Sequence, residues 1–164
     1  MRSGGAGLSL KGRALRLLAQ REHSRVELQR KLGPYAESAE QLAAVLAVLE
    51  EGGLLSSQRF AESLAHRRSE RFGLRRIEQE LGIHRLDASV TAPVLGRLRD
   101  TERERALGAW QKRFGALPVD AAERARQHRF LAQRGFTGES IAWVLRHGAD
   151  AAEPDIGAIG DEPA

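Results

Sequence analysis

The sequence contains no cysteine, and this absence excludes several kinds of site at once. Without thiols the chain can form neither disulfide bonds nor thiolate zinc sites, and it has no cysteine nucleophile. No apolar run approaches the ~18 residues that a membrane-spanning helix needs, and the N-terminal stretch MRSGGAG lacks the apolar segment of a secretory signal. We therefore expect a cytoplasmic protein that is not associated with a membrane.

Motifs for catalysis and for nucleotide binding are missing as well. The sequence has neither a GK[ST] phosphate-binding loop nor a GxGxxG turn that follows a strand pattern. Acids alternate with arginines at the spacing of solvated helical ion pairs. No two histidines stand at a metal-ligand spacing such as i, i+4; they are His23, His66, His84, His128 and His147. We predict that the chain is not an enzyme, and we expect it to hold no cofactor and no metal.

Valine, isoleucine and threonine, which favour strands, are sparse, whereas alanine, leucine, arginine and glutamate dominate the sequence. The composition therefore predicts an all-α fold. Three similar segments, which begin at Arg13, Arg59 and Arg105, recur at equal separations, and each opens a helical pattern. Such recurrence is typical of tandem modules. We predict an elongated tandem array of three three-helix units that resemble helix-turn-helix motifs, over residues 8–55, 56–100 and 101–148, with disorder in residues 1–7 and in an acidic tail, residues 149–164.

Capping residues and glycines mark the helix ends of the first unit. Leu10, Ala14, Leu17 and Leu18 form the apolar stripe of its first helix. The second helix should begin at a capping box of Ser24 and Glu27, and the third at a second capping box of Ser38 and Gln41. The pair Gly52-Gly53 should end the third helix.

The second and third units depart from a simple repeat. Pro93 predicts that the last helix of the second unit begins near Thr91, because proline is favoured in the first turn of a helix. The third unit is out of register with the other two. It is either a full repeat with an insertion around residues 115–119 or a diverged repeat, and both interpretations fit the pattern.

The stretch LAQRGFTGESIAWVL, residues 131–145, looks like a helix-turn-helix, which raises the question of whether it reads DNA. A recognition helix presents polar side chains to base edges in the major groove. Here five consecutive residues from Ile141 onward are apolar, and Glu139 in the first turn would repel phosphate. We instead predict a packing role, in which Phe136 contacts Ile141 and Trp143 fills the core.

Positive charge is carried almost entirely by arginine. The net charge is +4, and among 26 basic residues only Lys11, Lys31 and Lys112 are lysines. Arginine forms bidentate pairs with carboxylates and phosphates, so the composition suits an acidic protein surface or a nucleic-acid backbone. A GC-rich gene explains the ratio of arginine to lysine equally well. We expect any direct binding to single- or double-stranded DNA to be weak, sensitive to salt and indifferent to sequence.

The densest basic run is the candidate contact site, and it stands at the turn between the first two helices of the second unit. The run consists of Arg67, Arg68, Arg71, Arg75 and Arg76, with Arg21, Arg25 and Arg134 as lesser candidates. A solvated face that Glu70, Glu78 and Glu80 partly neutralise is the alternative interpretation.

Four segments resemble the RecX family of bacterial recombinase regulators: RALRLLAQREHSRVELQRKL, VLEEGGLLSSQRFAES, GLRRIEQEL and RFLAQRGFTGESIAWVLR. The last is the most specific, since members usually carry a similar Arg-Gly-Phe turn. The chain departs from the family at Ser56 and Ser57, where acidic residues are usual, which weakens the preference for a helix cap there.

The resemblance implies a regulator that binds the RecA filament on single-stranded DNA and lodges in its groove. There it would inhibit ATP hydrolysis, strand exchange and co-protease activity, and so modulate homologous recombination, DNA repair and the SOS response. It implies no catalytic residues, and we expect a monomer. The alternatives are a non-specific helical DNA-binding protein that acts without RecA, and a helical adaptor for an unrelated partner.

Overall fold

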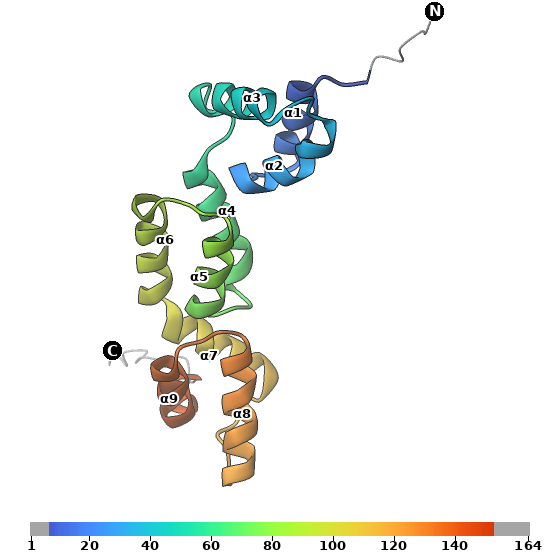
Figure 1. Cartoon of the computed structure of the whole chain (residues 1–164). Coiled ribbons are helices and arrows are strands. Elements are labelled where there is room, and N and C mark those ends of the chain that lie inside the picture. The colour runs from blue at the N-terminus through green and yellow to red at the C-terminus, as the bar shows by residue number, and fades with distance from the viewer. Residues whose placement is uncertain (1–6, 153–164) are drawn as a thin grey trace, which may run out of the picture. The chain divides into compact units, whose positions relative to one another are not determined.

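The computed structural model describes residues 7–152, and over this range it contains helices and no strand (Figure 1). The all-α prediction is therefore confirmed. The elements are α1 (Leu10–Gln20), α2 (Arg25–Leu32), the 3-10 helix η1 (Gly33–Tyr35), α3 (Ala39–Glu51), α4 (Ser57–Ser69), α5 (Leu74–Ile83), α6 (Ala88–Asp100), α7 (Glu102–Arg113), α8 (Ala121–Gln133), α9 (Gly138–His147) and η2 (Asp150–Ala152). None of the helices within residues 7–152 has the length and apolar character needed to cross a membrane.

The described chain divides into two compact units. The N-terminal unit comprises residues 7–68 and 77–97, and the C-terminal unit comprises residues 69–76 and 98–152. The division into three repeat units remains a prediction. The disorder predicted for residues 1–7 and 149–164 concerns segments that lie mostly outside the described residues, although η2 lies within the second of them.

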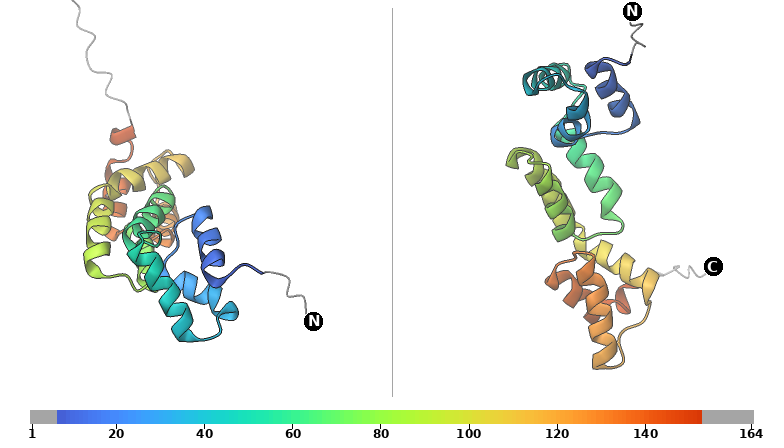
Figure 2. Two further views of the ribbon diagram at one scale, coloured as in Figure 1. Left: turned by 90° about the horizontal axis from the view of Figure 1, so that it is seen from above. Right: turned by 45° about the vertical axis from the view of Figure 1, so that its right-hand side comes forward.

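One hydrophobic core cluster of the N-terminal unit is built mainly from leucines of α1, α2 and α3, and these three helices lie together in every view (Figures 1 and 2). The stripe predicted for α1 faces this core: Leu10 and Ala14 are buried, and Leu17 and Leu18 are partly buried against it. The other buried members are Leu28, Leu32, Leu42, Leu46, Leu49 and Leu55.

The predicted capping boxes have different outcomes. At α2 the box is present: Glu27 N–H donates to the Ser24 hydroxyl oxygen (3.0 Å), and Ser24 N–H donates to the Glu27 carboxylate (3.2 Å). At α3 the Ser38 hydroxyl accepts from Gln41 N–H (3.1 Å), but the Gln41 side chain accepts from Glu37 N–H instead of from Ser38. The reciprocal half of the second box is therefore absent, and that prediction is wrong.

The end of α3 and the start of α6 give one confirmation and one correction. Gly52 caps α3, and Gly53 follows at φ +70°, which is a conformation that glycine adopts without a steric cost. In contrast, α6 begins at Ala88, a turn before the predicted start at Thr91, and Pro93 lies inside it. Proline in the second turn leaves only one carbonyl without its helical donor, and the Asp87 carbonyl starts the helix by accepting from Thr91 N–H (3.1 Å).

The core of the C-terminal unit surrounds Trp110 of α7, which is fully buried; its indole N–H donates to Gln127 Oε1 (2.7 Å). Phe136 and Ile141 belong to this core as predicted, but Trp143 is only partly buried and stacks on His147 (5.6 Å between ring centroids). Trp143 follows Ile141 by two residues, which is about 200° around the helix, so it packs at the edge of this core and is not buried within it.

The irregular spacing of the third repeat has a structural location. Its middle helix, α8, has 13 residues against 8 in α2, and the loop before it spans residues 114–120. The hydroxyl of Thr137 caps α9 as that of Ser24 caps α2, so these two turns are capped in the same way. The choice between a repeat with an insertion and a diverged repeat remains a prediction.

Candidate partner and nucleic-acid interface

Inside the C-terminal unit, the turn between α4 and α5 packs against the turn between α8 and α9. Gly73 N–H donates to the Arg134 carbonyl (2.8 Å), and Arg75 N–H donates to the Gly135 carbonyl (3.0 Å). A Cβ atom at Gly73 would overlap the backbone nitrogen of Phe136. The two backbones approach so closely that glycine is required at this contact.

One buried carboxylate joins the helices that follow these turns. Glu102, which is 3% exposed, accepts hydrogen bonds from Leu74 N–H (2.9 Å), Thr137 N–H (3.2 Å), and the hydroxyls of Thr137 (2.5 Å) and Ser140 (2.9 Å). Leu74 begins α5, and Thr137 is the N-cap of α9. The carboxylate therefore satisfies unpaired N–H groups of two helix starts and compensates their dipoles.

Arg105 of α7 holds the other end of the α4–α5 turn. Its guanidinium donates to the carbonyls of Ser69 (3.0 Å), Phe72 (2.8 Å) and Leu98 (2.8 Å). Burial lowers the pKa of this guanidinium, and the neighbouring Glu102 carboxylate partly opposes that effect. Glu102 and Arg105 thus fix the turn that carries part of the predicted basic run.

The basic run predicted from sequence is divided between the two units. Arg67 and Arg68 belong to the N-terminal unit, whereas Arg71, Arg75 and Arg76 belong to the C-terminal unit. Arg67 and Arg68 lie with Arg21 in one hollow of the N-terminal unit, and Arg71 lies with Arg134 in a separate hollow of the C-terminal unit. The N-terminal hollow has a volume of about 270 Å³ and is lined by Arg21, Glu27, Phe60, Leu64, Arg67, Arg68, Glu80 and His84.

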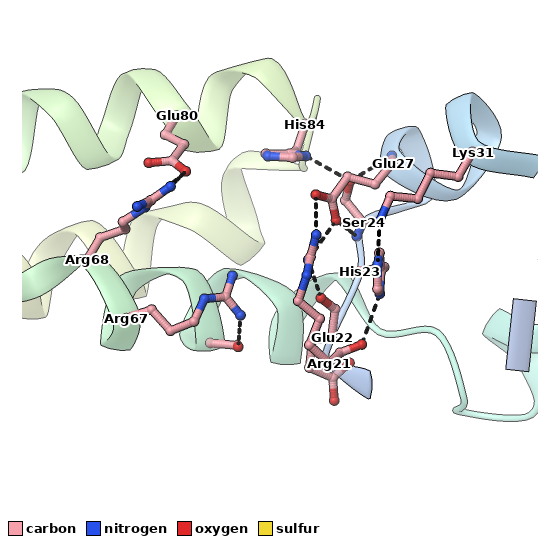
Figure 3. Close-up of polar contacts among 11 residues, drawn as sticks. Arg21, Glu22, His23, Ser24, Glu27, Lys31, Arg67, Arg68, Glu80 and His84 are labelled. Atoms are coloured by element: carbon pink, nitrogen blue, oxygen red, sulfur yellow. Dashed lines mark hydrogen bonds and ion pairs between the residues drawn. The ribbon is translucent and has the colours of Figure 1, made fainter. Parts of the chain in front are cut away.

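The arginines of the N-terminal hollow already have anionic or polar partners (Figure 3). Arg21 forms a bidentate pair with Glu27 (3.0 and 3.1 Å), and Arg68 pairs with Glu80 (2.8 Å). Arg67 donates to a serine hydroxyl one turn earlier on α4 (2.8 Å). An external anion would have to displace these contacts, so the local pairs favour a structural role for this group.

Two histidines stabilise the same region as neutral rings (Figure 3). His23 is 1% exposed; its Nδ1 donates to the Arg21 carbonyl (2.9 Å), which leaves Nε2 to accept from Lys31 Nζ (3.1 Å). His84 Nδ1 forms a hydrogen bond with the hydroxyl of Ser24, the N-cap of α2 (2.8 Å). Burial lowers the pKa of both imidazoles.

The second hollow gathers cations from three elements of the C-terminal unit. This basic hollow has a volume of about 540 Å³ and is lined by Glu70, Arg71, Ala109, Lys112, Arg113, Phe130 and Arg134. It brings together Arg71 and Arg134, which the sequence assigned to separate groups. Sequence reasoning missed Lys112 and Arg113; the available signal was their position in the last turn of α7.

The remaining candidates line neither hollow. Arg25 pairs with Glu50 (2.6 Å) and so links α2 to α3. The Arg76 guanidinium lies 4.7 Å from the centroid of the Phe72 ring. Arg75 is exposed, and its side chain makes no hydrogen bond or ion pair to another residue within 7–152.

The helix of the helix-turn-helix-like stretch, α9, is mainly a packing element. Ile141, Val144 and Leu145 are buried in the core of the C-terminal unit. In its first turn Glu139 forms an ion pair with Arg103 of α7. The face that this helix buries is consistent with the packing role expected from its apolar residues.

Comparison with known proteins gives a consistent set of relatives. A family model described as RecX, third three-helix domain, matches residues 100–145. The regulatory protein RecX of Ralstonia nicotianae is 47% identical to this chain over 156 residues, which cover 95% of both proteins. That of Leptothrix cholodnii is 52% identical over 139 residues, which cover 85% of this chain and 88% of the relative.

Solved structures are similar in fold. The crystal structure of RecX from Lactobacillus salivarius matches with a TM-score of 0.72 over 87% of this chain and 95% of that chain, at 16% sequence identity. A second crystal structure, of a regulatory protein RecX, matches with a TM-score of 0.71 over 84% of this chain and 71% of that chain. The helical arrangement is therefore shared even where few residues are identical.

Proposed function

Because this chain belongs to the RecX family of regulatory proteins, we propose that it binds the RecA filament on single-stranded DNA. Binding inhibits the ATPase, strand-exchange and co-protease activities of the filament, and thereby modulates recombination and the SOS response. The observation that carries the proposal is the 47% identity to a regulatory protein RecX along 95% of both chains. Because the similarity extends over 95% of both chains, it favours a partner that the two proteins share over a function that only one segment of the chain carries.

The charge distribution supports a partner that carries negative charge. Arginines stand on both units, and their planar guanidiniums form bidentate bonds with carboxylates and phosphates. A RecA filament on DNA offers both kinds of group. We propose that the principal contacts are Arg71, Arg75, Arg76 and Arg134. The arginines Arg21, Arg25, Arg67 and Arg68 are secondary candidates, because each must first give up an internal partner.

The test is the DNA-dependent ATPase activity of RecA at substoichiometric amounts of this protein. Inhibition is expected at concentrations too low to coat the DNA, since the regulator acts on the filament. Inhibition only at DNA-coating concentrations would favour the second candidate function, a non-specific helical DNA-binding protein that acts without RecA. That candidate is favoured by the basic hollow, which could hold phosphate without any protein partner.

A protein that bound neither RecA nor DNA would be a helical adaptor for another partner. Direct binding of fluorescently labelled protein to RecA, with and without DNA, distinguishes this outcome from the other two. We expect binding to RecA filaments at physiological salt, and a monomer in solution by light scattering.

A further inference from the structure

Three arginines of the basic hollow are positioned without using their hydrogen-bond donors. The guanidiniums of Arg71, Arg113 and Arg134 lie 5.8, 5.9 and 3.8 Å from the centroids of neighbouring phenylalanine rings. Their side chains form no hydrogen bond or ion pair with another residue in the described part of the chain. A cation–π contact engages the face of the guanidinium, so the N–H groups along its edge stay available for a ligand.

The fourth cation of the basic hollow, Lys112, is engaged by the one acid that lines it. Lys112 Nζ lies 2.8 Å from Glu70 Oε1, and both side chains are exposed, by 70% and 76%. The hydrogen bond from Lys112 and its positive charge lower the pKa of the Glu70 carboxyl, which is therefore ionised at neutral pH. Glu70 stands where an external anion would contact Lys112, and it competes with that anion.

We propose that the basic hollow binds the phosphate backbone of a nucleic acid, and that Glu70 acts as a built-in competitor at this site. The inference deepens the proposed function, on which it rests, by assigning the contact with DNA to these residues. Phosphate oxygens can accept from several guanidiniums at once. The apolar lining is limited to Ala109 and Phe130, and Arg134 covers one face of the phenylalanine ring. The hollow therefore holds backbone and reads no base.

The nature of the ligand is tested by fluorescence anisotropy with the full chain and no RecA. The probes are a labelled oligothymidylate and an abasic strand of the same length. We expect the two dissociation constants to agree within about twofold, because both strands carry the same phosphates. A large loss of affinity for the abasic strand would assign the site to bases and overturn the proposal. Titration with inorganic phosphate distinguishes a nucleic-acid phosphate from a free anion. If the protein binds inorganic phosphate more tightly than it binds the abasic strand, the hollow is a site for a free anion, and the proposal is overturned.

The cationic side of the site is tested by Arg71→Ala combined with Arg113→Ala. We expect the affinity for the abasic strand to fall by on the order of tenfold or more. The slope of the logarithm of the binding constant against the logarithm of the salt concentration should decrease in magnitude by about 0.7 for each phosphate that the variant no longer neutralises. The matched control is Arg124→Ala with Arg129→Ala, which removes the same charge from exposed positions of α8 in the same unit. Equal losses of affinity in the two variants would show an effect of net charge alone and would refute the site.

The competing carboxylate gives a second and opposite test. Glu70→Gln should raise the affinity for DNA several-fold, because Lys112 is released while every cation of the hollow is kept. Glu139→Gln is the control: Glu139 is 77% exposed, belongs to the same unit and is also ion-paired, with Arg103. Both substitutions change the net charge equally. An increase for Glu70→Gln alone supports the proposal, whereas no increase, or the same increase in both variants, contradicts it.

These assays separate the inference from the proposed function. If the variants change DNA binding as expected while the parent fails to inhibit the RecA ATPase, the hollow is a phosphate site and the proposed function fails. If the parent inhibits RecA but the Arg71, Arg113 and Glu70 variants bind DNA like their controls, the proposed function stands and the inference is wrong.

Discussion

At the scale of single residues, the two histidines of the N-terminal unit make its stability depend on pH. Burial lowers the pKa of His23 and His84 below the ordinary value of 6.5. The unfolded chain therefore takes up protons near pH 6.5, where the folded chain does not, and stability rises with pH in this range. The stabilisation that the neutral histidines provide is fully present above pH 6.5, and it is lost as the pH falls towards the lowered pKa values of the folded chain.

We predict that the urea midpoint of the protein falls between pH 7.5 and pH 5.5. The contribution of the buried His23 to the slope of the unfolding free energy against pH should not exceed about 1.4 kcal/mol per pH unit. Glu27 is not expected to contribute here: burial alone would raise its pKa, but bonds from Arg21 and Ser24 hold it below the ordinary 4.5. His84→Gln should reduce the slope, and a midpoint that rises on acidification would contradict the prediction.

A second residue-scale prediction concerns the exposed arginines that follow the α4–α5 turn. Arg75→Ala with Arg76→Ala should weaken inhibition of the RecA filament by more than tenfold, since each charge-assisted bond contributes ~1–3 kcal/mol. The fold should survive both substitutions. The hydrogen bond from residue 75 N–H to the Gly135 carbonyl joins backbone atoms only, and alanine at residue 76 keeps the Cβ atom that lies beside Gly135. The measurement is RecA ATPase inhibition after circular dichroism has verified the helix content.

The control for that double variant is Arg124→Ala with Arg129→Ala, which should inhibit like the parent. If the Arg75/Arg76 variant folds and also inhibits like the parent, these two arginines form a solvated face. The contact must then be sought among Arg71 and Arg134 or in the N-terminal unit.

At the scale of elements, the close contact between the α4–α5 and α8–α9 turns depends on glycine. Gly73→Ala should destabilise the protein by about 2–3 kcal/mol, because its Cβ would overlap the backbone of Phe136, which cannot move without disturbing the core. Gly138→Ala is a matched control, since a Cβ at the first position of α9 meets nothing within 4 Å. Urea unfolding compares the two variants, and equal midpoints would contradict the proposed role of this contact.

Helix ends were predictable where a local contact decides them. The start of α2 is set by the capping box of Ser24 and Glu27, and the end of α3 by Gly52 and Gly53. Both assignments depend on residues close in the chain, and both are confirmed. The start of α6 is predicted wrongly because Pro93 favours the first turn of a helix, whereas α6 begins one turn earlier, where the Asp87 carbonyl accepts from Thr91 N–H.

At the scale of the whole molecule, charge outside the described residues should affect binding to DNA. Deleting residues 153–164 removes four acids and no base, so the net positive charge of +4 doubles. We predict tighter binding to DNA at low salt and little change at high salt, because screening removes long-range attraction. Fluorescence anisotropy across a salt series measures this effect. An affinity that the deletion leaves unchanged at low salt would contradict the prediction.

The sequence alone determined the helical class, most helix boundaries of the first unit, and membership of a family of regulators. The helical class and the helix boundaries depend on composition, on periodicity and on contacts between residues close in the chain. Membership of the family rests instead on the similarity of whole segments to known relatives.

Only the tertiary structure decided which basic residues meet. It divided the run of five arginines between two units, engaged Arg68 with Glu80, and joined Arg71 and Arg134 to Lys112 and Arg113 in the basic hollow. Ion pairs and hollows form between residues distant in the chain, and their partners are set by how helices pack, so no local pattern encodes them.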